Sequence, residues 1–336
     1  MNVNNLELDY QKVEQTLVQF LRQEIQSAGF SKAVFGLSGG VDSAVTAFLS
    51  TRALGKENCL AVWMPYATSN PQHLEDGKKV VEQLGIRFST INISPMVDAF
   101  LANDSSMNQL RKGNIMARVR MITLFDFSAK EKAIVVGTSN KTEILLGYGT
   151  LFGDAACGIN PLGDLYKTQI WELAKHLGVP QTIIDKKPTA DLWLGQTDED
   201  ELGFSYKEVD KLLYTMFDEK KSESELIVNG FNENFIRDVE AILNDAKPTT
   251  NFPPHNIIKA DENKYVVELA VAGFSKNEID IHVQDGTLII KGDKQEKDGY
   301  EYLHRGIGTR SFTKSITIAD TIEVKGAEFK DGILRI

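Results

Sequence analysis

One short segment combines serine, glycine and aspartate in an order suited to binding phosphate and a cation. The segment is Ser38-Gly39-Gly40-Val41-Asp42-Ser43, and it lies between the apolar stretches 34–37 and 44–49. This order predicts a strand, a tight turn and the start of a helix. Backbone N–H groups at a helix N-terminus bind phosphate without a basic side chain, and Asp42 can contribute there only through an intervening cation. The pattern therefore predicts a site for a magnesium nucleotide.

The same turn has other interpretations. A glycine turn between a strand and a helix is common architecture without any ligand, no Gly-Lys-Ser/Thr follows it as in a Walker loop, and the dinucleotide fingerprint G-x-G-x-x-G is absent. Gly36-Leu37-Ser38-Gly39-Gly40 also fits the G-x-S-x-G nucleophile elbow, which predicts a serine hydrolase using Ser38. That alternative is weaker because only one helix and one strand are expected before Ser38. His176 also lies on the polar side of an ordinary predicted helix.

The composition predicts a globular protein of roughly two domains. The 336 residues include 42% hydrophobic and 25% charged residues, and the net charge of -10 disfavours a nucleic-acid partner. The two cysteines, Cys59 and Cys157, are too few for a disulfide framework or a cysteine metal site. No window approaches the ~18 apolar residues of a membrane span, and no secretory signal is recognisable. We therefore expect a cytoplasmic protein with no membrane partner.

We call residues 38–43 the phosphate turn. The elements around it predict an α/β fold with a doubly wound parallel sheet. Apolar periodicity and helix-terminating residues predict helices over 6–28, 71–84, 112–127 and 168–177, and strands over 34–37, 59–64, 87–93 and 133–137. Ligands of such sheets bind beyond the carboxyl ends of the strands. The phosphate turn and the segment Gly137-Thr138-Ser139-Asn140 are both expected there, so they should border one crevice.

Residues 184–204 lack a regular pattern and contain Trp193 and Leu194. Long irregular stretches in compact domains are commonly functional loops or disordered segments. Large apolar side chains have little reason to lie in a solvated tether, so we expect a lid that closes over the site.

The character of the chain changes after Ala246. The junction Lys247-Pro248-Thr249-Thr250-Asn251-Phe252-Pro253-Pro254 cannot be crossed by a helix or a central strand. Short alternating stretches follow, at 265–271, 279–283, 287–291 and 315–318, and they predict an antiparallel sandwich. We expect a first domain over 1–246, a linker over 247–253 and an all-β domain over 254–336.

The first domain resembles a known enzyme family. The hexapeptide 38–43 is similar to the signature of the ATP-pyrophosphatase group, whose fold is of the adenine nucleotide alpha hydrolase type. Further stretches resemble ammonia-dependent NAD synthetase over about residues 1–245. They are Lys112-Gly113-Asn114-Ile115-Met116-Ala117-Arg118-Val119-Arg120-Met121, Gly137-Thr138-Ser139-Asn140-Lys141-Thr142-Glu143, Leu146-Gly147-Tyr148-Gly149-Thr150 with Gly153-Asp154, Lys187-Pro188-Thr189-Ala190-Asp191-Leu192-Trp193 and Asp198-Glu199-Asp200-Glu201-Leu202-Gly203.

This resemblance implies that deamido-NAD, ATP and ammonia are converted through an NAD-adenylate into NAD, AMP and pyrophosphate. No protein nucleophile is required, Asp154 is a candidate for assisting ammonia deprotonation, and the family implies a homodimer. Asp42 and Glu143 would hold Mg²⁺, and Arg118 would bind deamido-NAD. The implied ATP contacts are Gly36, Leu37, Ser38, Gly39, Gly40, Val41, Asp42, Ser43, Thr138, Lys167 and Thr189.

The chain departs from the better-known family pattern at several places. Leu151 and Gly158 stand where many members have a lysine and an aspartate that contact deamido-NAD. A shorter subgroup shares this departure, so activity is still expected. No basic tail is recognisable after Asn244, and no glutaminase domain precedes Ser38. Free ammonia is therefore the expected nitrogen source.

Residues from about 252 to 336 resemble the α-crystallin domain of small heat-shock proteins. The matching stretches are Pro253-Pro254-His255-Asn256-Ile257, Val271-Ala272-Gly273-Phe274, Asp285-Gly286-Thr287-Leu288-Ile289-Ile290-Lys291-Gly292 and residues 326–334. The resemblance implies an immunoglobulin-like sandwich that holds unfolded-protein clients without ATP, with residues 300–306 as a dimer-exchange strand. His255, His282 and His304 share no metal-like spacing. The chain reaches Ile336 without an I-x-I tail, so we expect no assembly into large oligomers. A different hypothesis is a chaperone-like binding protein whose enzyme domain is vestigial.

Overall fold

The computed structural model divides the chain into two units, Met1–Ala246 and Lys247–Ile336. It describes residues 6–193, 195–245, 255–261, 264–284, 287–293, 312–318, 322, 324–330 and 332–336.

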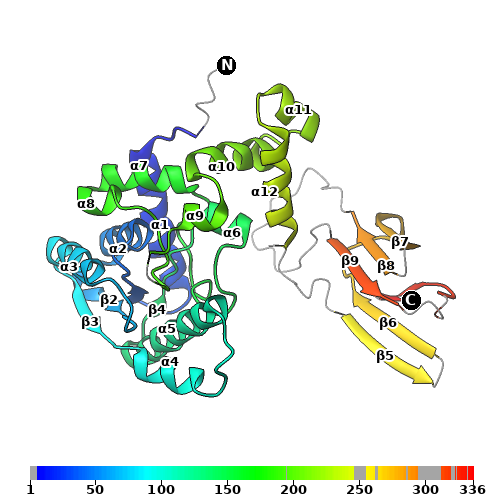
Figure 1. Ribbon diagram of the computed structural model, residues 1–336, viewed down its shortest axis with the longest axis horizontal. Coiled ribbons are helices and arrows are strands. Elements are labelled where there is room, and N and C mark those ends of the chain that lie inside the picture. Colours follow the sequence, from blue (N-terminus) through cyan, green and yellow to red (C-terminus); the bar gives the residue numbers. More distant parts are fainter. Residues whose placement is uncertain are drawn as a thin grey trace. The chain divides into compact units, whose positions relative to one another are not determined.

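The first unit is built on a parallel sheet. Its strands are β1 (Ala33–Gly36), β2 (Cys59–Trp63), β3 (Arg87–Thr90) and β4 (Ile134–Val135), in the order β3-β2-β1-β4. All three strand pairs are parallel, and an isolated parallel bridge joins Val136 to Ile159 beyond β4. The predicted parallel α/β sheet is therefore confirmed, and Figure 1 shows it among the helices.

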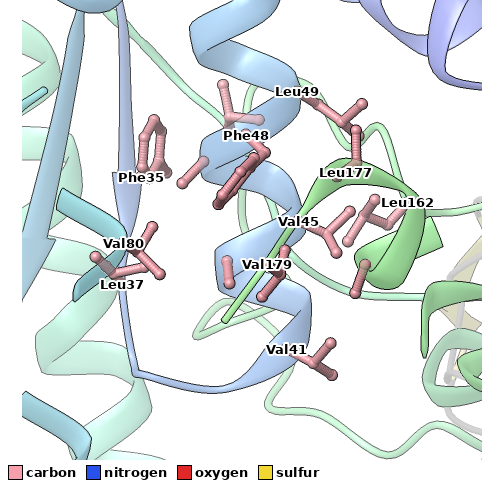
Figure 2. Packing of buried hydrophobic residues seen from close by; sticks show 14 of the residues in the cluster. Phe35, Leu37, Val41, Val45, Phe48, Leu49, Val80, Leu162, Leu177 and Val179 are labelled. Carbon is pink, nitrogen blue, oxygen red and sulfur yellow. The ribbon is translucent and has the colours of Figure 1, made fainter. Parts of the chain in front are cut away.

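Helices cover both faces of this sheet because the strand side chains alternate. Phe35 and Leu37 join a cluster with α1 (Tyr10–Ser27), α2 (Val41–Leu54), α3 (Pro71–Leu84) and α7 (Lys167–Leu177). Val34 points to the other face, where α4 (Ser94–Leu101) and α5 (Gln109–Glu131) pack. Figure 2 shows Phe35 facing Phe48 of α2 and Leu37 beside Val80 of α3, while Val45 and Leu49 lie on the side of α2 that faces Leu162 and Leu177. Because helices pack their apolar sides against both faces, the sheet is doubly wound, as predicted.

The strand order creates a crevice at one edge of the sheet. From β1 the chain moves outward through β2 to β3, and it then crosses back by α4 and α5 to place β4 on the other side of β1. The direction of winding therefore reverses between β1 and β4. In open α/β sheets this reversal leaves a crevice at the carboxyl ends of the two strands.

A further group of helices packs around a third cluster of the first unit. They are α6 (Lys141–Leu146), α9 (Asp198–Leu202), α10 (Tyr206–Leu213), a π-helix at Tyr214–Asp218, α11 (Glu223–Val228) and α12 (Glu233–Asp245). The short helix α8 (Gln181–Ile184) instead packs in the cluster of α1, α2, α3 and α7, and a short 3₁₀ turn lies at Lys56–Asn58. Tyr206, Val209 and Leu213 of α10 are buried in the third cluster, and α10 contacts both α6 and α7. Within the described residues, no helix combines the length and apolar character needed to cross a membrane.

The second unit is an antiparallel sandwich, which confirms the predicted class. One sheet has the order β10 (Glu328–Lys330), β11 (Ile333–Arg335), β6 (Lys264–Ala270) and β5 (His255–Asp261), and the other has β7 (Ile279–Gln284), β8 (Thr287–Gly292) and β9 (Phe312–Thr317). Lys276–Glu278 forms a short 3₁₀ turn. Phe274 and Phe312 pack edge to face with ring centroids 5.3 Å apart inside a buried cluster. A Cβ at Gly292 would lie 2.3 Å from Phe312 Cε1, so this strand needs glycine beside the aromatic pair.

Two expectations for the second half of the chain fall outside the described residues. They are the linker 247–253 and the dimer-exchange strand 300–306, and His304 lies there too. His282 is described, and its Nδ1 lies 2.9 Å from Asp280 Oδ2. Among the described residues no group of three or more His, Cys, Asp or Glu could hold a metal.

Candidate active site

The phosphate turn connects β1 to α2 and keeps its own hydroxyls engaged. The Ser43 hydroxyl donates to the Gly40 carbonyl at 2.9 Å and accepts from the Ser38 N–H at 3.2 Å. Ser38 Oγ lies 3.1 Å from Ser43 Oγ and accepts from the Gly40 N–H at 3.3 Å. Gly40 is the N-cap of α2, and within the part of the chain that the structure describes no side chain caps this helix. A turn of this kind leaves N-terminal amide groups available to an anion.

Gly39 fits this turn because no other residue could occupy its position without strain. Its φ is +77°, in the region that favours glycine. A Cβ at Gly39 would lie 2.3 Å from the carbonyl oxygen of His73 at the start of α3. The phosphate turn is therefore packed directly against the first turn of α3.

A buried lysine shared by two carboxylates lies beside this turn. Lys167 Nζ is 2.6 Å from Asp42 Oδ2 and 3.1 Å from Glu143 Oε1, and the lysine side chain is only 3% exposed. Burial alone would lower the pKa of Lys167, but the Asp42 and Glu143 charges outweigh it and raise that pKa above its usual value. Burial also raises the pKa of Glu143 to about 7, against the attraction of Lys167. The three charges from α2, α6 and α7 thus converge on one point.

Asn140 aligns the two carboxylates, and sequence reasoning did not assign it a role. Its side-chain oxygen accepts from the Glu143 N–H at 3.0 Å, and its Nδ2 donates to Asp42 Oδ1 at 2.9 Å. Asn140 is fully buried and forms a capping box with Glu143. The spacing N-x-x-E was a sequence signal for this cap, although it could not reveal the contact with Asp42.

Two tyrosines and a buried carboxyl complete the far side of the charged cluster. Lys167 Nζ lies 5.1 Å from the centroid of the Tyr206 ring. The Tyr206 hydroxyl donates to Asp198 Oδ2 at 3.1 Å, and the Tyr148 hydroxyl donates to Asp198 Oδ1 at 3.2 Å. Burial raises the pKa of Asp198. Asp198 is within the acidic run quoted for the resemblance, but only the fold brings it near Lys167.

The irregular segment between α8 and α9 is held on α3 at two points. Lys186 Nζ donates to the Gly39 carbonyl at 2.9 Å and pairs with Asp76, whose side chain is 2% exposed. Asp191 Oδ2 accepts from the Asn70 N–H at 3.2 Å and lies 3.2 Å from His73 Nδ1. The segment therefore contacts the phosphate turn directly, and closing over it stays a prediction.

A cavity of about 500 Å³ opens among these elements. The predicted site residues that line it are Gly36, Leu37, Ser38, Gly40, Val41, Asp42, Ser43, Thr138, Glu143, Asp154, Lys167 and Thr189. Gly39 and Arg118 do not line it. The Arg118 guanidinium donates instead to the Leu151 carbonyl at 3.2 Å.

Arg120 lines the cavity although the sequence analysis selected Arg118. Its Nε donates to the Met64 carbonyl at 3.1 Å, and burial lowers the pKa of its guanidinium. The two arginines are two positions apart on α5, so they point in different directions. Helical periodicity alone could not decide which of them faces the cavity.

Leu151 and Gly158, the two positions at which the sequence analysis noted a departure from the resemblance, have different surroundings. Leu151 is 52% exposed. A Cβ at Gly158 would lie 2.6 Å from Cγ1 of Ile134 on β4. Gly158 is therefore required by packing against the sheet.

The fold and this cavity define an α/β enzyme domain with a nucleotide-type site at the carboxyl ends of its strands. The sequence profile of the NAD synthase family matches residues 13–249, and that of the Hsp20/alpha crystallin family matches residues 257–336. The chain therefore belongs to the NAD synthase family of ligases and carries an Hsp20-type domain after the enzyme. The predicted enzyme class and both resemblances are confirmed.

The first unit is similar in sequence and structure to several known proteins. The chain is 52% identical over 251 residues to the NH3-dependent NAD+ synthetase of Fusobacterium nucleatum, covering 75% of this chain and 97% of that protein. It is 53% identical over 243 residues to the enzyme of Chlorobium phaeobacteroides, covering 72% and 88%. Among solved structures, NMN synthetase from Francisella tularensis has a TM-score of 0.64 at 36% identity, covering 72% of this chain and 95% of its own. The NH3-dependent NAD synthetase of Campylobacter jejuni has a TM-score of 0.61 at 34% identity, covering 71% and 95%.

We expect Asp76→Asn to destabilise the first unit in a pH-dependent way. Hydrogen bonds from Lys186, Lys79 and Gln72 outweigh burial and hold the pKa of Asp76 below its usual 3.8. A carboxyl with a lowered pKa contributes stability that is present above the unfolded-state value and lost as the pH falls through the folded-state value. The stability deficit of Asp76→Asn should therefore be largest near neutral pH, on the order of 1–3 kcal/mol, and shrink toward about pH 3.

The deficit can be measured by urea unfolding followed by tryptophan fluorescence. All three tryptophans, Trp63, Trp171 and Trp193, lie in the first unit, so the signal reports on that unit alone. Glu75→Gln on the same helix is the matched control, because Glu75 is exposed and its one ion pair among the described residues is with exposed Lys78. A deficit for Asp76→Asn that does not change with pH would contradict the prediction.

Proposed function

We propose that the first unit uses ATP and Mg²⁺ to join ammonia to deamido-NAD, giving NAD, AMP and pyrophosphate. The observation that carries this proposal is the Asp42–Lys167–Glu143 cluster beside the uncapped start of α2, inside a cavity of about 500 Å³. The cluster offers carboxylates for a cation and a lysine for phosphate, while the backbone turn offers N–H donors. The 52% identity to an NH3-dependent NAD+ synthetase supports the same assignment.

The residues present fit a magnesium nucleotide. Mg²⁺ is commonly bound in proteins by one or two carboxylates completed by substrate phosphates and water. Asp42 and Glu143 provide two carboxylates within 3.1 Å of one ammonium group, so their oxygens reach a common point. Bound there, Mg²⁺ would neutralise triphosphate charge and stabilise the departing pyrophosphate.

The chemistry makes an inert acid reactive without a protein nucleophile. A nicotinate carboxylate oxygen forms a bond to the α-phosphorus of ATP, and the bond from that phosphorus to pyrophosphate breaks. Ammonia then forms a C–N bond to the acyl carbon of the NAD-adenylate, AMP leaves, and a proton is lost. Ser38 is not needed as a nucleophile, and its recorded hydrogen bonds go to Ser43 and the Gly40 N–H.

Several side chains of the cavity wall have roles in this proposal. Thr138 and Thr189 bind ATP, and Lys167 transfers its contact from the carboxylates to phosphate. Arg118 meets deamido-NAD outside the cavity, beside Leu151. Asp154, whose Oδ1 accepts from the Thr150 N–H at 2.8 Å, assists ammonia deprotonation. The lid expected within residues 184–204 excludes water, which would otherwise hydrolyse the adenylate.

Removing the Asp42 carboxylate tests the metal assignment. We expect Asp42→Ala to lower the rate of NAD and AMP formation from ATP, deamido-NAD and ammonium by about 100-fold or more, because the Mg²⁺ that would stabilise transition-state charge loses a ligand. The products are quantified by chromatography. Glu82→Ala on the exposed side of α3 serves as the control. Equal rates for Asp42→Ala and wild type would remove the proposed metal site.

The same assay decides between two candidate substrates, deamido-NAD and the shorter nicotinate mononucleotide. NMN synthetase from Francisella tularensis is among the similar structures, so nicotinate mononucleotide is the second candidate acceptor of ammonia. We expect the higher kcat/KM for deamido-NAD, in keeping with the more similar curated relatives. A higher kcat/KM for nicotinate mononucleotide would assign the shorter substrate instead.

We propose further that the first unit forms a homodimer through α4 and α5. These contacting helices expose Met96, Phe100, Ile122 and Phe125, with Ile122 57% and Phe100 50% exposed. Exposed apolar side chains gathered on two contacting helices favour an interface. When two copies of one chain use the same surface, the simplest closed assembly is a two-fold dimer.

Ile122→Glu should convert this dimer to a monomer, because a buried unpaired carboxylate is costly. Sedimentation of residues 1–246 and of the full chain measures the mass. Val228→Glu on α11, where Val228 is 86% exposed, should leave the dimer intact. A wild-type first unit that sediments as a monomer would contradict the proposal.

For the second unit we propose a modest ATP-independent holding of unfolded chains. Among the described strands, β5 lies at the edge of its sheet, and Ile257 of β5 and Tyr265 of β6 are 59% and 49% exposed. An unpaired strand edge accepts another extended chain. We expect the full chain to reduce light scattering by a heated client protein several-fold more than residues 1–246 do at equal concentration. Equal scattering in the two samples would refute this role.

A further inference from the structure

The first turn of α7 is capped by side chains from other parts of the chain. A helix leaves its first N–H groups without intrahelical partners. Here the Tyr166 N–H donates to Gln169 Oε1 at 2.9 Å, the Lys167 N–H to Thr142 Oγ1 at 3.0 Å, and the Thr168 N–H to Asp210 Oδ2 at 2.7 Å. Only the first of these acceptors belongs to α7. The other two come from α6 and α10, so the start of α7 is fixed by tertiary contacts.

Asp210 is the centre of this arrangement. It is fully buried on α10, and its second oxygen accepts from the Thr142 hydroxyl at 2.6 Å. Thr142 is itself fully buried. One carboxylate therefore holds the hydroxyl of α6 and the backbone of α7, and that hydroxyl in turn accepts from the Lys167 N–H.

The two helices joined in this way carry the functional charges. Thr142 immediately precedes Glu143 on α6, and Thr168 immediately follows Lys167 on α7. A lysine at the first position of a helix is disfavoured by the positive N-terminal end of the dipole, whereas a nearby carboxylate is favoured. Asp210 supplies that carboxylate from outside the cavity, which it does not line.

A second carboxylate repeats the connection nearer the surface. Asp218 accepts from Lys141 Nζ at 2.7 Å and from the Tyr166 hydroxyl at 2.6 Å. Lys141 and Tyr166 each stand at the start of the same two helices, but the Asp218 side chain is 35% exposed. A charge partly in water contributes less to geometry than a buried one, so the buried Asp210 is the principal connection.

We propose that Asp210 is the positioning residue that sets the distance between the Glu143 carboxylate and the Lys167 ammonium. This inference rests on the proposed function, in which those two groups serve Mg²⁺ and ATP. Asp210 touches neither substrate, and it acts through Thr142 and the backbone of Thr168. Loss of either link lets α6 and α7 shift relative to each other.

Two substitutions probe the two links. Asp210→Asn keeps the shape but presents an NH2 group to one of two donors, Thr142 Oγ1–H or the Thr168 N–H. Thr142→Val keeps the volume and removes the hydroxyl, and Thr142→Ser restores it. Glu208→Gln on α10 is the matched control, because Glu208 is exposed and bonded within its own capping box.

The readouts are kcat, the KM for Mg-ATP, the KM for deamido-NAD, Mg-ATP binding by calorimetry, and urea unfolding by tryptophan fluorescence, all with the full chain. We expect Asp210→Asn and Thr142→Val to lower kcat/KM for Mg-ATP by about 10- to 100-fold, as a misplacement near 1 Å does, and to weaken Mg-ATP binding. The KM for deamido-NAD should stay within about two-fold of wild type. Thr142→Ser should recover most of the loss, and Glu208→Gln should behave as wild type.

A residue with a purely structural role gives a different pattern. It lowers the unfolding midpoint and the fraction of active protein, but leaves both KM values of the folded fraction unchanged. That pattern, or equal losses in Thr142→Ser and Thr142→Val, would overturn the inference. If Asp210→Asn does not fold, the two Thr142 variants decide. Wild type that binds no Mg-ATP and forms no NAD would instead refute the proposed function.

Discussion

The first unit depends on one interaction, the sharing of a buried ammonium group between two carboxylates. Lys167 lies 2.6 Å from Asp42 and 3.1 Å from Glu143 with almost no exposure to solvent. A buried ion pair contributes little to stability unless its geometry is excellent and its remaining hydrogen bonds are satisfied. Asn140 meets part of this requirement by bonding to both carboxyl-bearing residues. The intact cluster also argues against a vestigial enzyme domain, because unused buried charge would be costly to keep.

The topology of the sheet explains why such distant residues meet. Asp42 follows β1 and Glu143 follows β4, and these strands are neighbours in the order β3-β2-β1-β4. Because the strands are parallel, their carboxyl ends lie at one edge, where the winding direction reverses. The apolar faces on each side, with Phe35 in one cluster and Val34 in the other, hold that edge rigidly. Local sequence places the charges at strand ends, and packing brings the ends together.

Sequence reasoning succeeded where the information was local. The helix predicted at 71–84 is α3 (Pro71–Leu84), because proline at its start and glycine after its end mark both limits. The phosphate turn was equally recognisable from its glycines and serines. Arg120, Asn140, Asp198 and Asp210 were not assigned, since their importance comes from partners on other helices. The helices beyond residue 197 were also not predicted, because residues 198–245 pack on a cluster that only the tertiary structure creates. In the second unit, β5, β10 and β11 were missed because their strands are short or polar.

One glycine is fixed by its contact with the central sheet. A Cβ at Gly158 would meet the side chain of Ile134 at 2.6 Å, and Ile134 is part of the short strand β4 that pairs with β1. A larger residue at position 158 therefore cannot be introduced alone. A shorter side chain at residue 134 would have to accompany it, so positions 158 and 134 have to be changed together in any redesign of this edge of the sheet.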